Sequence, residues 1–281
     1  MVCTGRAVRR VQAGEAVAVD PAITCGQCDQ CRAGRHNTCR RIRFLGSAGE
    51  APGCMRDYIV MPESCLYPLR GGVSLEQAVL VEPFSIGVYA VKQSGLPIDG
   101  SFAVLGAGPI GLSVLLAAIH QRAGQSFITD RVDHRVSVAK RAGAAWAGNP
   151  DREDIVRAIL ERQPDGMDVV FECAGQPEAL DQAVALLKPG GKLMLVGIPR
   201  QDRISLVIDT LRRNEIAIVN VRRQNHCVEA ALELIASKSV DLDFMVTHRV
   251  LLEQASAAFE TAAGYANGII KAIINFESAQ E

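Results

Sequence analysis

Four cysteines lie close together in the first forty residues, at Cys25, Cys28, Cys31 and Cys39. Their spacing is C-x2-C-x2-C-x7-C, and thiolates carried on such tight turns can converge on one tetrahedral zinc ion. Gly26 and Gly34 suit these turns because glycine tolerates a positive φ. Four thiolates fill the coordination shell, so we expect a structural zinc. Two disulfides or four uncoordinated thiols are the alternatives, and the compact spacing favours the metal.

A glycine-rich turn lies in the middle of the chain. It follows a short apolar run at 101–105, read as a buried parallel strand, and precedes an apolar helical stretch at 112–120. Strand, glycines and helix in this order are typical of a dinucleotide-binding unit. The first glycine permits the turn, the second lets backbone approach the pyrophosphate, and the third allows close helix packing. The expected cofactor-binding residues of this turn are Gly106, Gly108, Pro109, Ile110 and Gly111.

An acidic residue ends the next predicted strand, 126–129. Asp130 lies 24 residues after Gly106, where a carboxylate can accept hydrogen bonds from the adenosine ribose. It would repel a 2′-phosphate, which favours NAD over NADP. Arg131 and Arg135 complicate this prediction, since an arginine nearby can accommodate that phosphate. The alternative role of Asp130 is to cap the following helix.

Strands and helices continue to alternate after this unit. Helices are expected at about 152–161 and 177–187, and strands at 168–172, 192–196 and 215–221. About six parallel strands in this order predict an α/β fold with a doubly wound parallel Rossmann sheet. A helix at 88–93 leads into this region. Helices near 228–237 and 253–263 and a strand at 269–276 follow it.

Composition fits a soluble enzyme of two domains, with 281 residues and 48% hydrophobic content. Four zinc-bound thiolates would take the formal net charge from −1 to −3, and neither value is typical of a nucleic-acid-binding protein. We also expect no signal peptide, no membrane span and a reducing, cytoplasmic location. We expect the arginines around the cysteines to form a solvated face whose charge offsets that of the zinc tetrathiolate. A partner-binding patch is the alternative. These arginines are Arg32, Arg35, Arg40, Arg41 and Arg43.

The cysteine spacing and the preceding run at 14–21 resemble those of the zinc-containing medium-chain alcohol and polyol dehydrogenases. The resemblance covers essentially the whole chain. It implies a discontinuous, GroES-like, β-rich catalytic domain at 1–93 with a structural-zinc lobe at 20–45. An NAD-binding Rossmann domain at 94–222 follows, and 223–281 returns to the catalytic domain. A homodimer or homotetramer is expected from the family only.

Further positions resemble sorbitol dehydrogenases within that family. Glu82, in the run at 80–87, stands where these enzymes carry a glutamate and is implied as a catalytic-zinc ligand. Arg222 and Arg223 lie where polyol-contacting residues are expected, and Arg223 replaces an aromatic residue of the animal enzymes. Phe44 is a further candidate for this pocket. The resemblance places Val196, Gly197, Ile198, Val221 and Arg222 against the nicotinamide.

The implied reaction is the NAD-dependent oxidation of a polyol or secondary alcohol to a ketone, with the hydroxyl bound and acidified by zinc. The sequence departs from the family at this zinc, because no histidine is followed by glutamate as in the expected Gly-His-Glu. When the run at 14–21 is aligned with the corresponding run of the family, Met1 falls a few residues after the position of that motif. We therefore expect an incomplete catalytic zinc site. An upstream start, a truncated gene and a non-catalytic NAD-binding protein are the three explanations.

Other functions stay open beside this one. The main alternative is a non-catalytic zinc- and NAD-binding remnant or pseudoenzyme. A zinc-knot nucleic-acid module is disfavoured by the net charge and by the dinucleotide motif. A zinc-free quinone reductase of the same superfamily is disfavoured by the intact cysteine cluster and by Glu82.

Overall fold

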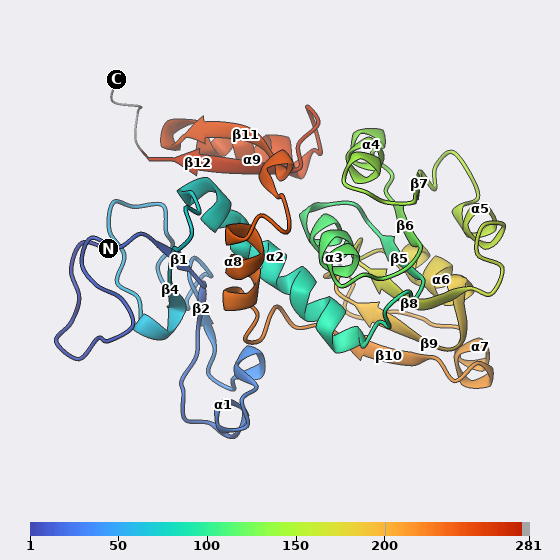
Figure 1. The fold of residues 1–281 in the computed structure, drawn as a ribbon, viewed down its shortest axis with the longest axis horizontal. Helices are drawn as coiled ribbons and strands as arrows, with labels where there is room; N and C mark the ends of the chain where they lie inside the picture. The colour runs from blue at the N-terminus through green and yellow to red at the C-terminus, as the bar shows by residue number, and fades with distance from the viewer. Residues whose placement is uncertain (200, 277–281) are drawn as a thin grey trace. The chain divides into compact units, whose positions relative to one another are not determined.

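The computed structural model describes residues 1–199 and 201–276 and divides the chain into two compact units (Figure 1). Unit 1 combines Met1–Ser85 with Arg222–Glu281, and unit 2 is Ile86–Val221. The first division falls inside the long helix α2, Leu75–Ser94. None of the helices in the described parts combines the length and the apolar character needed to cross a membrane.

Unit 2 contains one six-stranded sheet in the order β10-β9-β8-β5-β6-β7, with every neighbouring pair parallel. The strand order reverses beside β5, which is the doubly wound arrangement that the alternating pattern predicts. The strands are β5 (Phe102–Leu105), β6 (Ser126–Thr129), β7 (Trp146–Gly148), β8 (Met167–Glu172), β9 (Leu187–Leu195) and β10 (Ala217–Asn220).

Helices pack against both faces of this sheet (Figure 1). They are α3 (Pro109–His120), α4 (Asp133–Arg141), α5 (Ile155–Leu160), α6 (Pro177–Leu186) and α7 (Ile208–Arg213). β5 is apolar along its whole length, and β6 and β8 are apolar in their middle residues, as expected of strands that are covered on both faces. Phe102 and Phe171 pack edge to face at 6.3 Å between ring centroids, and both are fully buried. This core fixes the carboxyl ends of the strands, where the glycine-rich turn begins.

Three two-stranded sheets lie in the described part of unit 1. β1 (Val17–Val19) pairs antiparallel with β4 (Leu66–Pro68), and β2 (Ala22–Ile23) pairs antiparallel with β3 (Arg43–Phe44). β11 (Val246–Leu251) and β12 (Lys271–Asn275) are parallel, joined through α9 (Ala255–Ala263). The remaining helices are α1 (Asp29–Arg32) and α8 (Val228–Ala236). Single 3₁₀ turns lie at His36–Thr38, Glu63–Cys65, Asp243–Met245 and Leu252–Gln254.

Candidate functional site

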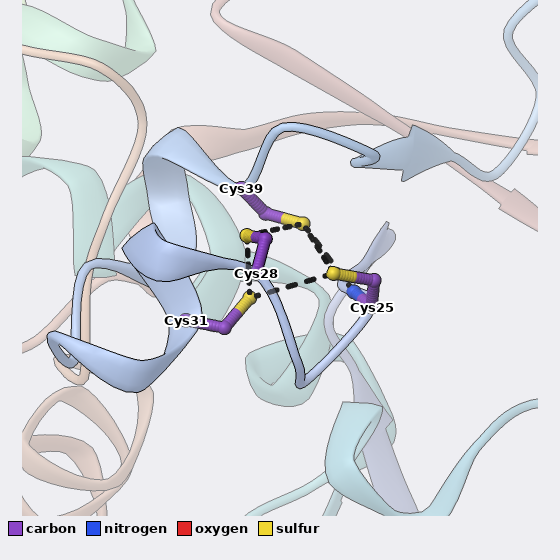
Figure 2. Close-up of side chains that lie close together, drawn as sticks. All are labelled: Cys25, Cys28, Cys31 and Cys39. Carbon is purple, nitrogen blue, oxygen red and sulfur yellow. Dashed lines mark hydrogen bonds between the residues drawn. The ribbon is translucent and has the colours of Figure 1, made fainter.

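The four cysteines converge on one point in unit 1 (Figure 2). The Sγ–Sγ distances are 3.5 Å for Cys25–Cys39, 3.6 Å for Cys28–Cys31, and 4.0 Å for both Cys25–Cys31 and Cys28–Cys39. Zinc–sulfur bonds of about 2.3 Å in a tetrahedron require sulfur atoms about 3.8 Å apart. The cluster therefore has the dimensions of a zinc tetrathiolate, and the residues present fit this metal.

Short turns and one helical turn place the sulfur atoms. Gly26 and Gly34 adopt φ angles of +70° and +73°, in the left-handed region that glycine enters without strain. Backbone N–H groups then point at the sulfur of Cys39, from Cys25 at 3.3 Å and from Arg41 at 3.4 Å. N–H groups directed at a thiolate stabilise its negative charge.

The thiols differ in how readily they lose a proton. A backbone hydrogen bond from Gln27 is the largest cause that lowers the pKa of Cys25, to about 6. Desolvation raises the pKa of Cys31 to about 12. Because zinc binds thiolates, metal binding must displace the proton of Cys31. We infer that zinc uptake at this cluster releases protons.

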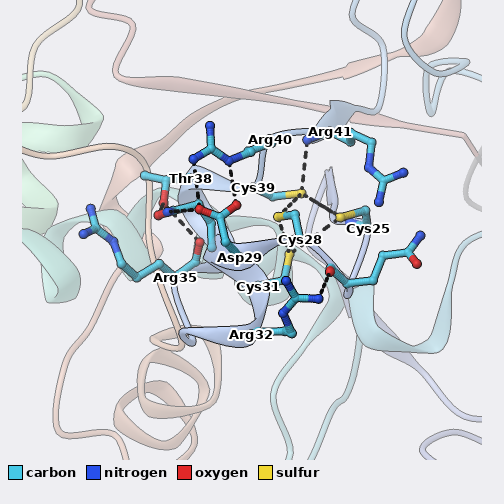
Figure 3. Close-up of polar contacts among 12 residues, drawn as sticks. Cys25, Cys28, Asp29, Cys31, Arg32, Arg35, Thr38, Cys39, Arg40 and Arg41 are labelled. Carbon is cyan, nitrogen blue, oxygen red and sulfur yellow. Dashed lines mark hydrogen bonds and ion pairs between the residues drawn. The ribbon is translucent and has the colours of Figure 1, made fainter.

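All five arginines around the cluster are exposed, as expected of a solvated face, and two of them also bond within the loop (Figure 3). Arg40 makes two hydrogen bonds to Asp29, at 2.6 and 2.9 Å, and this guanidinium holds the pKa of Asp29 well below its usual range. Arg32 donates instead to the carbonyl oxygen of Gln27 at 2.9 Å. Part of the basic charge therefore stabilises the loop itself.

A second set of contacts holds this lobe to the segment that begins at Arg222. The side chain of Asn225 accepts from the His36 N–H at 3.1 Å and donates to the Gly34 carbonyl at 2.9 Å. Asn37 donates to the carbonyl of Arg222 at 3.0 Å, and the His36 and His226 rings meet at 4.7 Å between centroids. We call these contacts the lobe clamp.

The glycine-rich turn of unit 2 joins β5 to α3. Gly106 has φ +106°, and Gly108 precedes Pro109, the first residue of α3. A Cβ on Gly111 would lie only 1.8 Å from the carbonyl oxygen of Gly106. The turn and the helix thus touch at backbone level, which leaves the helix N-terminus facing the carboxyl edge of the sheet.

Asp130 fixes the conformation of this turn. Its Oδ2 accepts from the N–H of Ala107 and its Oδ1 from the N–H of Val132, both at 2.8 Å. Arg135 Nη1 lies 3.8 Å from Oδ2. The following helix, α4, has Val132 as its N-cap residue, so Asp130 braces the glycine turn rather than capping that helix.

The other expected cofactor positions lie at the same edge of the sheet. Val196 and Gly197 follow β9, and their N–H groups donate to the carbonyl of Glu172 at 2.9 and 2.8 Å. Val221 follows β10, and Ile198 is 90% exposed. Glu172 is a residue that the sequence interpretation assigned no role. It is 2% exposed, accepts from two backbone N–H groups, and burial raises its pKa.

Arg223 forms a charged network in unit 1 with Asp20 and Glu82. Arg223 Nη2 lies 3.0 Å from Asp20 Oδ1 and 3.2 Å from Glu82 Oε1. Gln224 donates to the other oxygen of Asp20 at 2.7 Å. The guanidinium of Arg223 also lies 4.7 Å from the ring centroid of Phe44, and that of Arg222 lies 5.2 Å from it. Asp20 and Gln224 were not predicted as site residues.

Comparison with known proteins decides the family. Residues 1–71 match the alcohol dehydrogenase GroES-like domain, and residues 109–237 match the zinc-binding dehydrogenase model. Sorbitol dehydrogenase of Bacillus subtilis is 34% identical over 98% of this chain and 78% of its own. The chain belongs to the zinc-dependent alcohol dehydrogenase family.

Solved structures of this family have the same fold. An Escherichia coli oxidoreductase of unknown specificity superposes with a TM-score of 0.92 at 30% identity, covering 99% of this chain and 80% of its own. A Sinorhizobium meliloti protein with bound NADP superposes with a TM-score of 0.90 at 28% identity, covering 96% and 79%. The predicted fold class and family are thereby confirmed, and zinc and a nicotinamide dinucleotide are the cofactors of the family.

The cysteine cluster of this dehydrogenase fits zinc, but the surroundings of Glu82 do not. Among the residues that the structure describes, the cysteine cluster is the one group of three or more His, Cys, Asp or Glu side chains close enough to share a metal. The partner of Glu82 is a cation, Arg223. A catalytic zinc needs three protein ligands and cannot be held by one carboxylate.

We expect the lobe clamp to make the stability of this dehydrogenase depend on pH. Burial, and then the neighbouring His226, lower the pKa of His36, so the folded state favours the neutral ring. In the unfolded chain this histidine has its ordinary pKa of about 6.5. The contribution of His36 to the free energy of unfolding is therefore complete above that pH, and it is lost as the pH falls below it. We expect the His36→Phe variant to show a flatter decline in Tm than the parent between about pH 7.5 and 5.5.

The control for this measurement is His120→Gln, which removes an exposed histidine of unit 2. It should keep the parent's pH dependence. Zinc content must be measured at each pH, since thiolate protonation also releases the metal. Equal slopes for His36→Phe and the parent would contradict the role of this ring.

Proposed function

We propose that this dehydrogenase uses NAD to oxidise a polyol or a secondary alcohol to a ketone. The observation that carries the proposal is the carboxyl edge of the six-stranded sheet, where the glycine-rich turn, the start of α3 and the Asp130 carboxylate lie together. Hydride would pass from the carbinol carbon to the nicotinamide ring, and the hydroxyl proton would be released to solvent. The contribution of the protein is to hold donor and acceptor in contact.

Roles for individual residues follow from this proposal. The N–H groups of the turn and of the first turn of α3 would bind the pyrophosphate. Val196, Gly197, Ile198 and Val221 would lie along the nicotinamide, and Arg222, Arg223 and Glu82 would contact the alcohol. In this proposal residues 94–222 are the cofactor domain. Residues 1–93 and 223–281 are the catalytic domain, and 277–281 lie outside the described residues.

Two measurements on the purified chain test the function. We expect calorimetric titration to detect NAD binding. Because the surroundings of Glu82 do not fit a catalytic zinc, we expect only impaired NADH formation with sorbitol or another member of a panel of polyols and secondary alcohols. Binding of NAD without turnover of any alcohol would indicate the alternative, a non-catalytic zinc- and NAD-binding protein. The ion pair between Glu82 and Arg223 is the observation that favours this alternative. If the chain bound neither NAD nor NADP, both the dehydrogenase function and the non-catalytic alternative would be contradicted.

The choice of NAD over NADP depends on the charge of Asp130. In the Asp130→Asn variant one oxygen remains to accept from Ala107 N–H, while the repulsion of a 2′-phosphate is removed. We expect the ratio of the Kd for NADPH to the Kd for NADH to fall by roughly tenfold or more. Fluorescence titration with both reduced dinucleotides measures this ratio.

Asp133→Asn is the matched control, because Asp133 is an exposed carboxylate in the first turn of α4 that pairs with Arg152. It should leave the ratio unchanged. An unchanged ratio in Asp130→Asn would mean that Arg135 and the surrounding backbone, rather than the carboxylate, set the cofactor preference. The homodimer or homotetramer and the cytoplasmic location stay predictions.

A further inference from the structure

The guanidinium of Arg223 stands between two carboxylates that come from distant parts of the sequence. Asp20 directly follows β1, Glu82 lies on α2, and Arg223 begins the last part of unit 1. The side chains of Arg223 and Asp20 are each 10% exposed, and that of Glu82 is 34% exposed. Charges with so little access to water are stable only when they are paired and hydrogen-bonded.

The geometry around Arg223 is that of a built site rather than a chance surface contact. One nitrogen, Nη2, serves both carboxylates, at 3.0 and 3.2 Å. Gln224 occupies the second oxygen of Asp20, and the Phe44 ring covers the guanidinium. Arg223 also adopts φ +53°, a conformation that costs a non-glycine residue free energy and that the network must stabilise.

We propose that in this chain the guanidinium of Arg223 takes the place of a metal ion beside Glu82, so that the chain binds one zinc, at the cysteine cluster. A zinc ion would need a carboxylate oxygen at about 2.0–2.2 Å and at least two further ligands. Glu82 Oε1 is already shared with Arg223. A dication at that oxygen would also lie next to the fixed positive charge of Nη2.

Zinc counting tests the proposal without measuring turnover. The 281-residue chain would be produced with added zinc, dialysed and analysed by mass spectrometry for metal per chain. We expect one zinc in the parent, one in Glu82→Gln and one in Arg223→Met, and less than one in Cys28→Ser. Two zinc ions in the parent, with one lost in Glu82→Gln, would overturn it.

Cobalt provides a second measurement, made on the parent chain and on Glu82→Gln. Replacement of zinc by Co²⁺ should give the visible absorption of a tetrathiolate site alone. Additional bands from cobalt bound to oxygen ligands, absent in Glu82→Gln, would overturn the proposal. The ion pair itself is tested by the Tm of Arg223→Met, Glu82→Gln and the double variant.

We expect Arg223→Met to lower Tm by several degrees because it leaves two carboxylates close together without a cation. Glu82→Gln in that background should recover part of the loss, since it removes one of the two charges. Strictly additive changes in Tm would contradict the ion pair.

Discussion

Replacing Gly111 by alanine is expected to abolish dinucleotide binding and to lower the stability of unit 2 by about 3 kcal/mol or more. Helix propensity alone predicts the opposite sign, because alanine in a helix is favoured over glycine by up to about 1 kcal/mol. The steric contact made by the new Cβ decides the sign of the stability change. The new Cβ would lie 1.8 Å from the Gly106 carbonyl oxygen, which is backbone and cannot move without displacing the turn.

Gly108→Ala is the matched comparison, since its Cβ would meet only the guanidinium of Arg135, at 3.5 Å. This variant should keep the parent's Tm and still lose affinity for NADH, because the methyl group stands where the pyrophosphate approaches. Thermal unfolding and fluorescence titration of both variants separate the two effects. Parent-like stability and affinity in Gly111→Ala would mean that α3 can move away from β5.

Loss of the zinc lobe is the second large effect that we expect. Cys28→Ser removes one of the four ligands, and structural zinc sites contribute about 10 kcal/mol or more to folding in zinc-finger peptides. The segment from Cys25 to Cys39 contains only a four-residue helix and one 3₁₀ turn, so regular secondary structure contributes little to its shape. We expect loss of zinc and a large decrease in Tm. Fast amide hydrogen exchange should appear throughout this segment.

Cys54→Ser is the control for this experiment, because Cys54 is exposed and lies outside the cluster. It should retain zinc, Tm and the exchange protection of the lobe. Chelation of zinc from the parent chain should reproduce the behaviour of Cys28→Ser. If slow exchange persisted in the lobe after complete zinc removal, the fold of this segment would not depend on the metal.

Local patterns predicted much of unit 2. Continuous apolar runs located β5, β6 and β8, and the glycine turn located the start of α3. The sequence interpretation missed α4 because most of its residues are polar or charged and only Val136, Val138 and Ala139 are buried. It missed β7 because that strand has three residues. It also placed the start of α2 too late, since Pro83 and Gly87 read as breaks in a helix.

Gly87 shows why that pattern was misleading. It lies within α2 at a close approach, where a Cβ would come within 2.5 Å of the backbone of Ser113 on α3. The cysteine cluster was predictable because its ligands lie within fifteen residues. The Asp20–Arg223 ion pair was not predictable, because the two residues lie 203 positions apart and local sequence patterns do not indicate contacts at such a separation.

The lobe clamp has a consequence for synthesis of the chain. His36 and Asn225 are separated by 189 residues, so the ribosome must add the whole of unit 2 between them. At about 5–20 residues per second this interval is roughly 10 to 40 seconds. Throughout that interval the lobe can acquire zinc but lacks Asn225 and His226, so only the metal and the contacts within the lobe can stabilise it.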